Sequence, residues 1–345
     1  MALKVARGGM NLANEFLESQ RSCGDEQADK LIGTLAADNN LPRVYDALAL
    51  PAEKRKRVKN EVTRFLSETR KHPEWYDARQ IALGQDVFKR YALDVMMLLG
   101  AMSLPYCYAA SPGNKALYLA GKMRQQIAKR LTDTASFVMA VLTRGSFEAR
   151  GDALYNIQKT RLIHALVRHH LSHQRWDAAW GLPINQEDMA GTNLAFSYVI
   201  LLGLQQSGVS LTQKEKEAFL AVWRLTGYHL QIDERLLPAS WDEARALEQA
   251  IHRRHFKKSD EGLSLTRELV HYYQRTFPPM AAYLIDSQMR YFLGPEISGY
   301  LGLEPEPLKD RVRIYVSAIR EAMNVLMVNP NGYAKLMALA KEPKG

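Results

Sequence analysis

Cysteine is scarce in this chain of 345 residues, which contains only Cys23 and Cys107. Two thiols cannot form a disulfide scaffold or a cysteine-rich metal site, so we expect a fold that depends on an ordinary apolar core. This usage fits a reducing compartment, and we expect a cytoplasmic protein. Cys107 lies between two tyrosines with no neighbouring base, which is typical of a small buried residue rather than a nucleophile.

Long hydrophobic runs and targeting signals are also missing. The two most apolar windows, residues 95–104 and 194–204, are shorter than the roughly 20 residues that a membrane-spanning helix needs. The N-terminus has no apolar region followed by a cleavage site of small residues. We therefore predict neither a signal peptide nor an integral membrane segment.

The chain lacks the common nucleotide and hydrolase signatures: a glycine-rich phosphate loop, a G-x-S-x-G turn and a dinucleotide-binding fingerprint. Its net charge of +9 permits contact with nucleic acid, but no recognisable nucleic-acid-binding motif accompanies the charge. We expect no nucleic-acid partner. The densest basic run, residues 54–59, is typical of a solvated helix face.

Helical periodicity is present along almost the whole chain. It predicts helices over residues 81–102, 117–141, 154–174, 186–206, 213–231, 241–255, 263–275 and 311–324. Thr212 with Glu215, and Ser240 with Glu243, have the spacing of helix N-caps. Since sustained alternation rich in Val, Ile and Thr is absent, we predict an all-α protein with one large helical domain over residues 61–345. Residues 1–60 are predicted to form a loosely attached helical extension.

One histidine in the predicted helix over residues 154–174 has an unusual setting. His164 lies within an apolar run, with Arg161 three residues before it and Arg168 four residues after it. Because these spacings bring side chains to a common helix face, we expect the three residues to form one strip. A buried arginine needs an anionic partner, and the carboxylates of a haem would supply it. His164 is therefore a candidate axial ligand for haem iron.

Two further groups of residues are candidates for chemistry. Arg130, Asp133 and Thr134 share a helix face by spacing, either as a local stabilising pair or as part of a pocket. His169 and His173 have the i, i+4 spacing of a metal chelate. Their polar setting near a helix end favours the simpler interpretation that they interact with the helix dipole.

Six short motifs occur in the order found in a known family. They are residues 83–88 (LGQDVF), 103–110 (SLPYCYAA), 130–134 (RLTDT), 161–168 (RLIHALVR), 180–189 (WGLPINQEDM) and 223–228 (WRLTGY). With these motifs the chain resembles the superfamily of rubber oxygenases, or latex clearing proteins, and the oxygenases of mycophenolic acid synthesis. The resemblance runs from about residue 75 to about residue 238 and more weakly to the C-terminus. It implies an all-α, globin-like core that holds haem b.

The resemblance also assigns roles to individual residues. His164 matches the proximal iron ligand, and Arg161 matches the arginine one turn before it. Arg130 and Thr134 match an arginine and a threonine of the haem pocket. We therefore take Arg130, Asp133 and Thr134 as candidate catalytic residues, and His164, Arg161, Arg130, Thr134 and Arg168 as candidate cofactor-binding residues.

Two positions depart from the family pattern. Asp133 stands where latex clearing proteins can place a distal lysine, and the region of Asn114 lacks their distal glutamate. The expected protein is a haem b oxygenase that uses dioxygen on a small apolar substrate, isoprenoid or lipid-like. The alternative is a non-catalytic carrier or sensor of haem or of a lipophilic ligand. The oligomeric state is not predicted.

Overall fold

The computed structural model describes residues 12–49, 60–67, 71–124, 127–149, 151–174, 176–277, 279–307 and 310. Within these ranges the chain is helical, and the β-type pairing is limited to an isolated bridge between Ala110 and Phe256. The prediction of a single all-α domain is confirmed. The basic run at residues 54–59 and the helix predicted over residues 311–324 lie outside the described residues.

The N-terminal helices pack on the rest of the domain. They are α1 (Asn14–Gln20), α2 (Glu26–Ala37), α3 (Pro42–Ala49) and α5 (Glu61–Ser67). Leu17 of α1 is fully buried in the main core. Ile32, Val44 and Phe65 form a second, smaller core with Leu162 of α10 (Ala153–Ser172). These contacts hold residues 14–49 firmly to the domain, whereas a domain boundary at residue 60 stays a prediction.

A long apolar helical stretch forms the middle of the core. It consists of α6 (Ala78–Leu98), the π-helical turn η1 (Leu99–Ser103) and α7 (Leu104–Ala109). By length and composition this stretch could cross a membrane, but most of its apolar window is buried inside the protein, as in a core helix. Gly84 permits its tight crossing with α13 (Gln213–His229), because a Cβ at this position would lie 2.2 Å from the carbonyl oxygen of Ala218.

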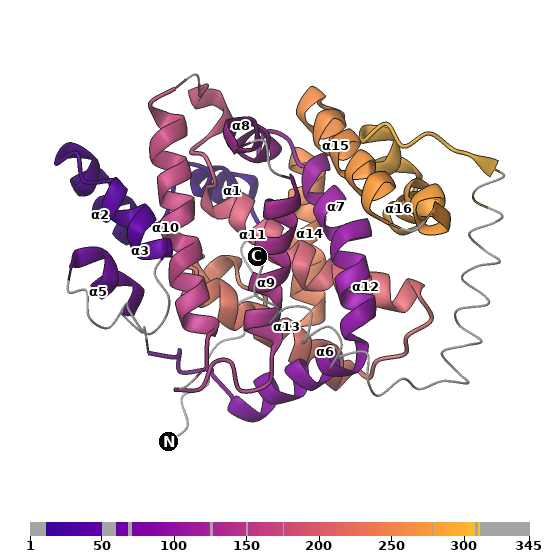
Figure 1. Ribbon diagram of the computed structural model, residues 1–345. Helices are drawn as coiled ribbons and strands as arrows, with labels where there is room; N and C mark the ends of the chain where they lie inside the picture. Colours follow the sequence, from indigo (N-terminus) through magenta and orange to yellow (C-terminus); the bar gives the residue numbers. More distant parts are fainter. Residues whose placement is uncertain are drawn as a thin grey trace.

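The remaining helices surround this stretch (Figure 1). They are α8 (Asn114–Arg124), α9 (Ile127–Leu142), α11 (Gln186–Phe196), α12 (Tyr198–Gln206), α14 (Trp241–His255), α15 (Asp260–Thr276) and α16 (Pro279–Tyr300). α9 runs through the centre of the view and contacts α6, α10 and α15. Helices from distant parts of the chain therefore converge around one interior region.

Most predicted helices are confirmed, and their breaks differ from the prediction. The predicted helix over residues 117–141 is divided between α8 and α9, and that over residues 186–206 breaks at Ser197. Thr212 forms the predicted capping box with Glu215, and the Ser240 side chain accepts the backbone N–H of Glu243. α16 was not predicted, because its kink at Gly294 and Pro295 interrupts the periodic pattern.

Candidate functional site

A cavity of about 1110 Å³ lies between the central helices. Side chains of α7, α9, α10, α11, α14 and α15 line it. The lining is predominantly apolar and includes Leu104, Phe137, Ile163, Val167, Phe196 and Phe256. Ordinary small-molecule sites occupy about 300–1,000 Å³. The cavity therefore exceeds the usual range and has room for a bulky apolar ligand.

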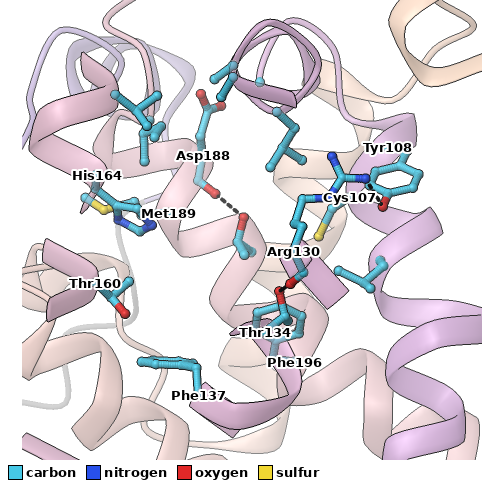
Figure 2. Close-up of a pocket in the computed structure, with 18 of the residues that line it drawn as sticks. Cys107, Tyr108, Arg130, Thr134, Phe137, Thr160, His164, Asp188, Met189 and Phe196 are labelled. Carbon is cyan, nitrogen blue, oxygen red and sulfur yellow. Dashed lines mark hydrogen bonds between the residues drawn. The ribbon is translucent and has the colours of Figure 1, made fainter. Parts of the chain in front are cut away.

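His164 contributes an imidazole from α10 to the lining of this cavity (Figure 2). Burial, with help from the positive charge of Arg168 and against the charge of Asp25, lowers its pKa from 6.5 to about 4. The ring is therefore neutral at physiological pH. Within the described residues neither ring nitrogen has a hydrogen-bond partner, so the unprotonated nitrogen keeps a free lone pair.

The two arginines predicted to accompany His164 point elsewhere, which corrects the prediction. Arg161 is buried and forms a bidentate ion pair with Asp25, at 2.6 Å from Nε to Oδ2 and 2.9 Å from Nη2 to Oδ1. Arg168 pairs with Asp29, at 2.8 Å from Nε to Oδ1. Neither arginine lines the cavity. Their anionic partners in this structure are carboxylates of the N-terminal segment.

Helix geometry explains how the predicted strip divides. At 3.6 residues per turn, Arg161 and Arg168 differ by only about 20° around the helix axis, whereas His164 is about 40–60° away from both. That rotation is enough to direct the imidazole to the cavity while both guanidinium groups meet α2. Asp25 also caps α2 by accepting the backbone N–H of Ala28, so the ion pair fastens α2 to α10.

Arg130 and Thr134 of α9 line the cavity, as does Asp133 at its solvent-exposed edge. Nη2 of Arg130 donates to the Tyr108 hydroxyl at 3.1 Å, and the Thr134 hydroxyl donates to the backbone oxygen of Arg130 at 2.9 Å. Asp133 forms a surface ion pair with Lys129 at 2.5 Å. Arg130 and Thr134 therefore present polar groups to the interior, whereas the Asp133 carboxylate is engaged at the surface.

Asn114, at the second position that departs from the family pattern, has a structural environment. Its side chain is buried, and its Nδ2 donates to the backbone oxygen of Tyr108 and to the Ser259 hydroxyl, each at 2.8 Å. It is not among the residues that line the cavity. Asn114 therefore joins the start of α8 to α7 and α15, and it supplies no acid or base to the site.

Cys107 and Tyr108 line the cavity from α7 (Figure 2). Burial raises the pKa of the Cys107 thiol to about 12, so it remains protonated and is a poor nucleophile. Burial also raises the pKa of Tyr108, although the neighbouring Arg130 opposes this shift. Cys107 is partly rather than fully buried, and it behaves as the predicted unreactive side chain.

A buried ionic cluster, which the sequence did not reveal, forms another part of the lining. The Glu187 carboxylate is fully buried and lies 2.8 Å from Nε of Arg254 and 2.9 Å from Nε2 of His255. Burial raises the pKa of Glu187, but hydrogen bonds from His255 and Arg254 outweigh it, and the net pKa is lowered. Arg21 pairs with Asp188 at 3.1 Å. The cluster joins α1, α11 and α14 behind the cavity.

The two histidines with chelate spacing, His169 and His173, lie near the end of α10. Their ring centroids are 4.3 Å apart, and Nδ1 of His173 donates to the backbone oxygen of His169 at 2.6 Å. In the part of the chain that the structure describes, no group of three or more His, Cys, Asp or Glu side chains could hold a metal ion. The helix-end interpretation thus has the more direct support.

The fold and the site define an all-α domain with a large, mostly apolar cavity that a neutral histidine lines. A model of the family described as ER-bound oxygenase mpaB/B′/Rubber oxygenase, catalytic domain, matches residues 89–326. The chain belongs to this family, and it is an oxygenase.

Two proteins are similar to this chain over most of its length. The chain is 25% identical over 300 residues to a rubber oxygenase of Streptomyces sp. (strain K30). The aligned region covers 84% of this chain and 72% of that protein. A structure of latex clearing protein LCP in the closed state is 23% identical and superposes with a TM-score of 0.75. That match covers 92% of this chain and 90% of the other. At this identity the second relative supports the shared fold.

Proposed function

We propose that the protein is a haem b-dependent oxygenase that acts with dioxygen on an apolar substrate, isoprenoid or lipid-like. The observation that carries the proposal is the neutral imidazole of His164, which has no hydrogen-bond partner among the described residues and lies in the lining of a large apolar cavity. Family membership supplies the reaction class. The rubber oxygenase relative supports an isoprenoid substrate.

The residues present fit a metal that is already bound by an organic cofactor, and they do not fit a bare metal ion. One histidine cannot hold a bare metal ion, and the described residues offer no set of three ligands. A haem carries its iron in the porphyrin, and His164 would hold it through the imidazole. When bound, the haem would supply iron for activating dioxygen. Arg130, which has no carboxylate partner among the described residues, would meet an anionic group of the cofactor.

The other cavity residues would control the surroundings of the reaction. The apolar side chains exclude water and bind a hydrophobic substrate by burying its surface. The guanidinium of Arg130 is positioned by the hydroxyl of Tyr108, and the Thr134 oxygen keeps lone pairs that can accept a hydrogen bond. These groups would orient polar atoms within an otherwise apolar space.

The experiment that tests the cofactor is titration of the purified protein with haem b, followed by absorption spectroscopy. The wild type is expected to show the Soret band of bound haem, and His164→Ala is expected to lose it because the axial imidazole is gone. His169→Ala is the matched control, since this residue lies on the same helix but outside the cavity lining. An undiminished Soret band in His164→Ala would refute the assignment.

Oxygen consumption tests the reaction. With squalene dispersed in detergent as the probe, the haem-loaded wild type is expected to consume dioxygen and to release cleaved or oxygenated products. Haem uptake without dioxygen consumption, across squalene and a fatty acid with double bonds, would instead favour a carrier or sensor of haem.

A further inference from the structure

Five carboxylates line the cavity in the part of the chain that the structure describes, and Glu248 differs from the others. The five are Asp133, Glu187, Asp188, Glu248 and Glu268. Two are exposed at the edge, and two belong to the buried cluster with arginine partners. Glu248 is partly buried, and its side-chain partners are a phenol and an imidazole, groups that can transfer protons.

A continuous series of polar groups leads from Glu248 to the surface. The hydroxyl of Tyr106, a second residue of the cavity lining, donates a hydrogen bond to Oε1 of Glu248. Nδ1 of His252 lies 3.5 Å from the same Oε1, one helical turn further along α14. Nε2 of His252 lies 3.6 Å from Oε1 of Glu296 on α16. The Glu296 side chain is 62% exposed, so the series ends in solvent.

Aromatic side chains enclose the inner part of this series. Phe256 stacks on the ring of His252, with centroids 4.4 Å apart and an interplanar angle of 15°. The Phe256 ring also lies 4.6 Å from that of Tyr106. The phenol of Tyr106 is buried. The side chain of His252 is 24% exposed and that of Glu248 is 14% exposed, so His252 offers protons a route from Glu248 to solvent.

We propose that Glu248 accepts protons from the cavity, through Tyr106 or directly, and that His252 transfers them to solvent beside Glu296. This inference rests on the proposed oxygenase function and adds a proton acceptor to it. The orientation of the hydrogen bond supports this direction: Tyr106 gives its proton to Glu248, while the phenol oxygen takes up the proton released in the cavity. Glu248 then passes a proton to neutral His252, which exchanges with solvent. Tyr106 ends protonated and Glu248 ionised, as at the start.

The charges around Glu248 are consistent with this assignment. The hydrogen bond that His252 donates to the Glu248 carboxylate, with the charge of Glu296, raises the pKa of His252 and so favours proton transfer to the imidazole. Burial and the Glu248 carboxylate raise the pKa of Tyr106, so the phenol is protonated at rest. Tyr198 on α12 also faces Glu248, and its pKa is raised by burial and by that carboxylate.

The proposal predicts that the pKa of His252 depends on the Glu248 carboxylate. NMR of protein with ¹³C-labelled histidine is expected to show a lower His252 pKa in Glu248→Gln than in the wild type, because the carboxylate partner is removed. Glu268→Gln removes a cavity-lining carboxylate of α15 and is expected to leave the His252 pKa unchanged. An unchanged His252 pKa in Glu248→Gln would overturn the proposal. This measurement needs neither haem nor dioxygen.

Turnover supplies the second readout. With squalene as probe, Glu248→Gln is expected to lower kcat about 100-fold or more with KM unchanged, the usual size of a general acid–base contribution. The solvent deuterium isotope effect on kcat is expected to rise, because proton transfer becomes rate-limiting. An unchanged kcat in Glu248→Gln overturns the proposed proton transfer through Glu248 and His252, and leaves the proposed oxygenase function standing. A wild type that binds haem but consumes no dioxygen overturns the proposed function, while the His252 titration still decides the linkage.

Discussion

The ion pair between Asp25 and Arg161 gives the sharpest test of how the N-terminal segment is held. Both side chains are 3% exposed, and two short hydrogen bonds join them. Asp25→Asn removes the negative charge but keeps an oxygen that can still cap α2 at Ala28. The variant therefore leaves the Arg161 charge buried without a compensating anion, while the helix cap is retained.

The expected cost follows from this burial. Removing one partner of a buried ion pair costs about 3–5 kcal/mol, and we take about 3 kcal/mol because the amide still accepts one hydrogen bond. Unfolding a chain of 345 residues carries an entropy of about 0.7 kcal/mol/K, at about 2 cal/mol/K per residue. Asp25→Asn should therefore lower the melting temperature by about 4 °C.

Differential scanning calorimetry of the haem-free protein measures this shift. Asp133→Asn, which breaks the exposed pair with Lys129, is the matched control and should change the melting temperature by less than about 1 °C. The double variant Asp25→Asn with Arg161→Met should recover part of the loss, because no unpaired charge remains. If Asp25→Asn melted like the wild type while Arg161→Met lost haem, Arg161 would face the cofactor and the reasoning would be wrong.

Two further predictions concern cysteine reactivity and acid stability. Iodoacetamide at neutral pH should alkylate exposed Cys23 and spare Cys107, whose thiol has a pKa of about 12, as mass spectrometry of the peptides would show. Equal labelling of both thiols would contradict that assignment. The pKa of Glu187 in the folded protein is lowered from 4.5. Its pairs with His255 and Arg254 therefore stabilise the fold above pH 4.5, and this stabilisation is lost as the pH falls through the pKa of Glu187 in the folded protein. The melting temperature should fall less steeply below pH 4.5 in Glu187→Gln than in the wild type, and equal slopes would argue against this role.

The helices were largely predictable because their signals are local. The box of Thr212 and Glu215 lies within four residues, and the apolar periodicity of each helix repeats within one or two turns. Breaks between consecutive helices were less predictable. At Ser197 the backbone leaves the helical region at φ −112° and ψ −81°, although the surrounding residues continue the apolar pattern.

The site was predictable only in part, because spacing does not determine which partner a side chain meets. His164, Arg130 and Thr134 line the cavity as expected, while Arg161 and Arg168 turn to carboxylates more than 130 residues away in sequence. Binding of haem, the substrate and the cytoplasmic location stay predictions. The spacing of Glu248 and His252 on one helix was visible, but nothing local showed that this pair lies at a cavity.

The sequence by itself determined the helical class, most of the helix starts and the family, since these depend on periodicity, capping residues and ordered motifs. Only the tertiary structure decided that His164 faces the cavity while its neighbouring arginines fasten α2 to α10. The physical reason is that a buried charge takes whichever opposite charge the packing brings near it. Chain positions far apart supply that charge, and their meeting depends on the whole fold.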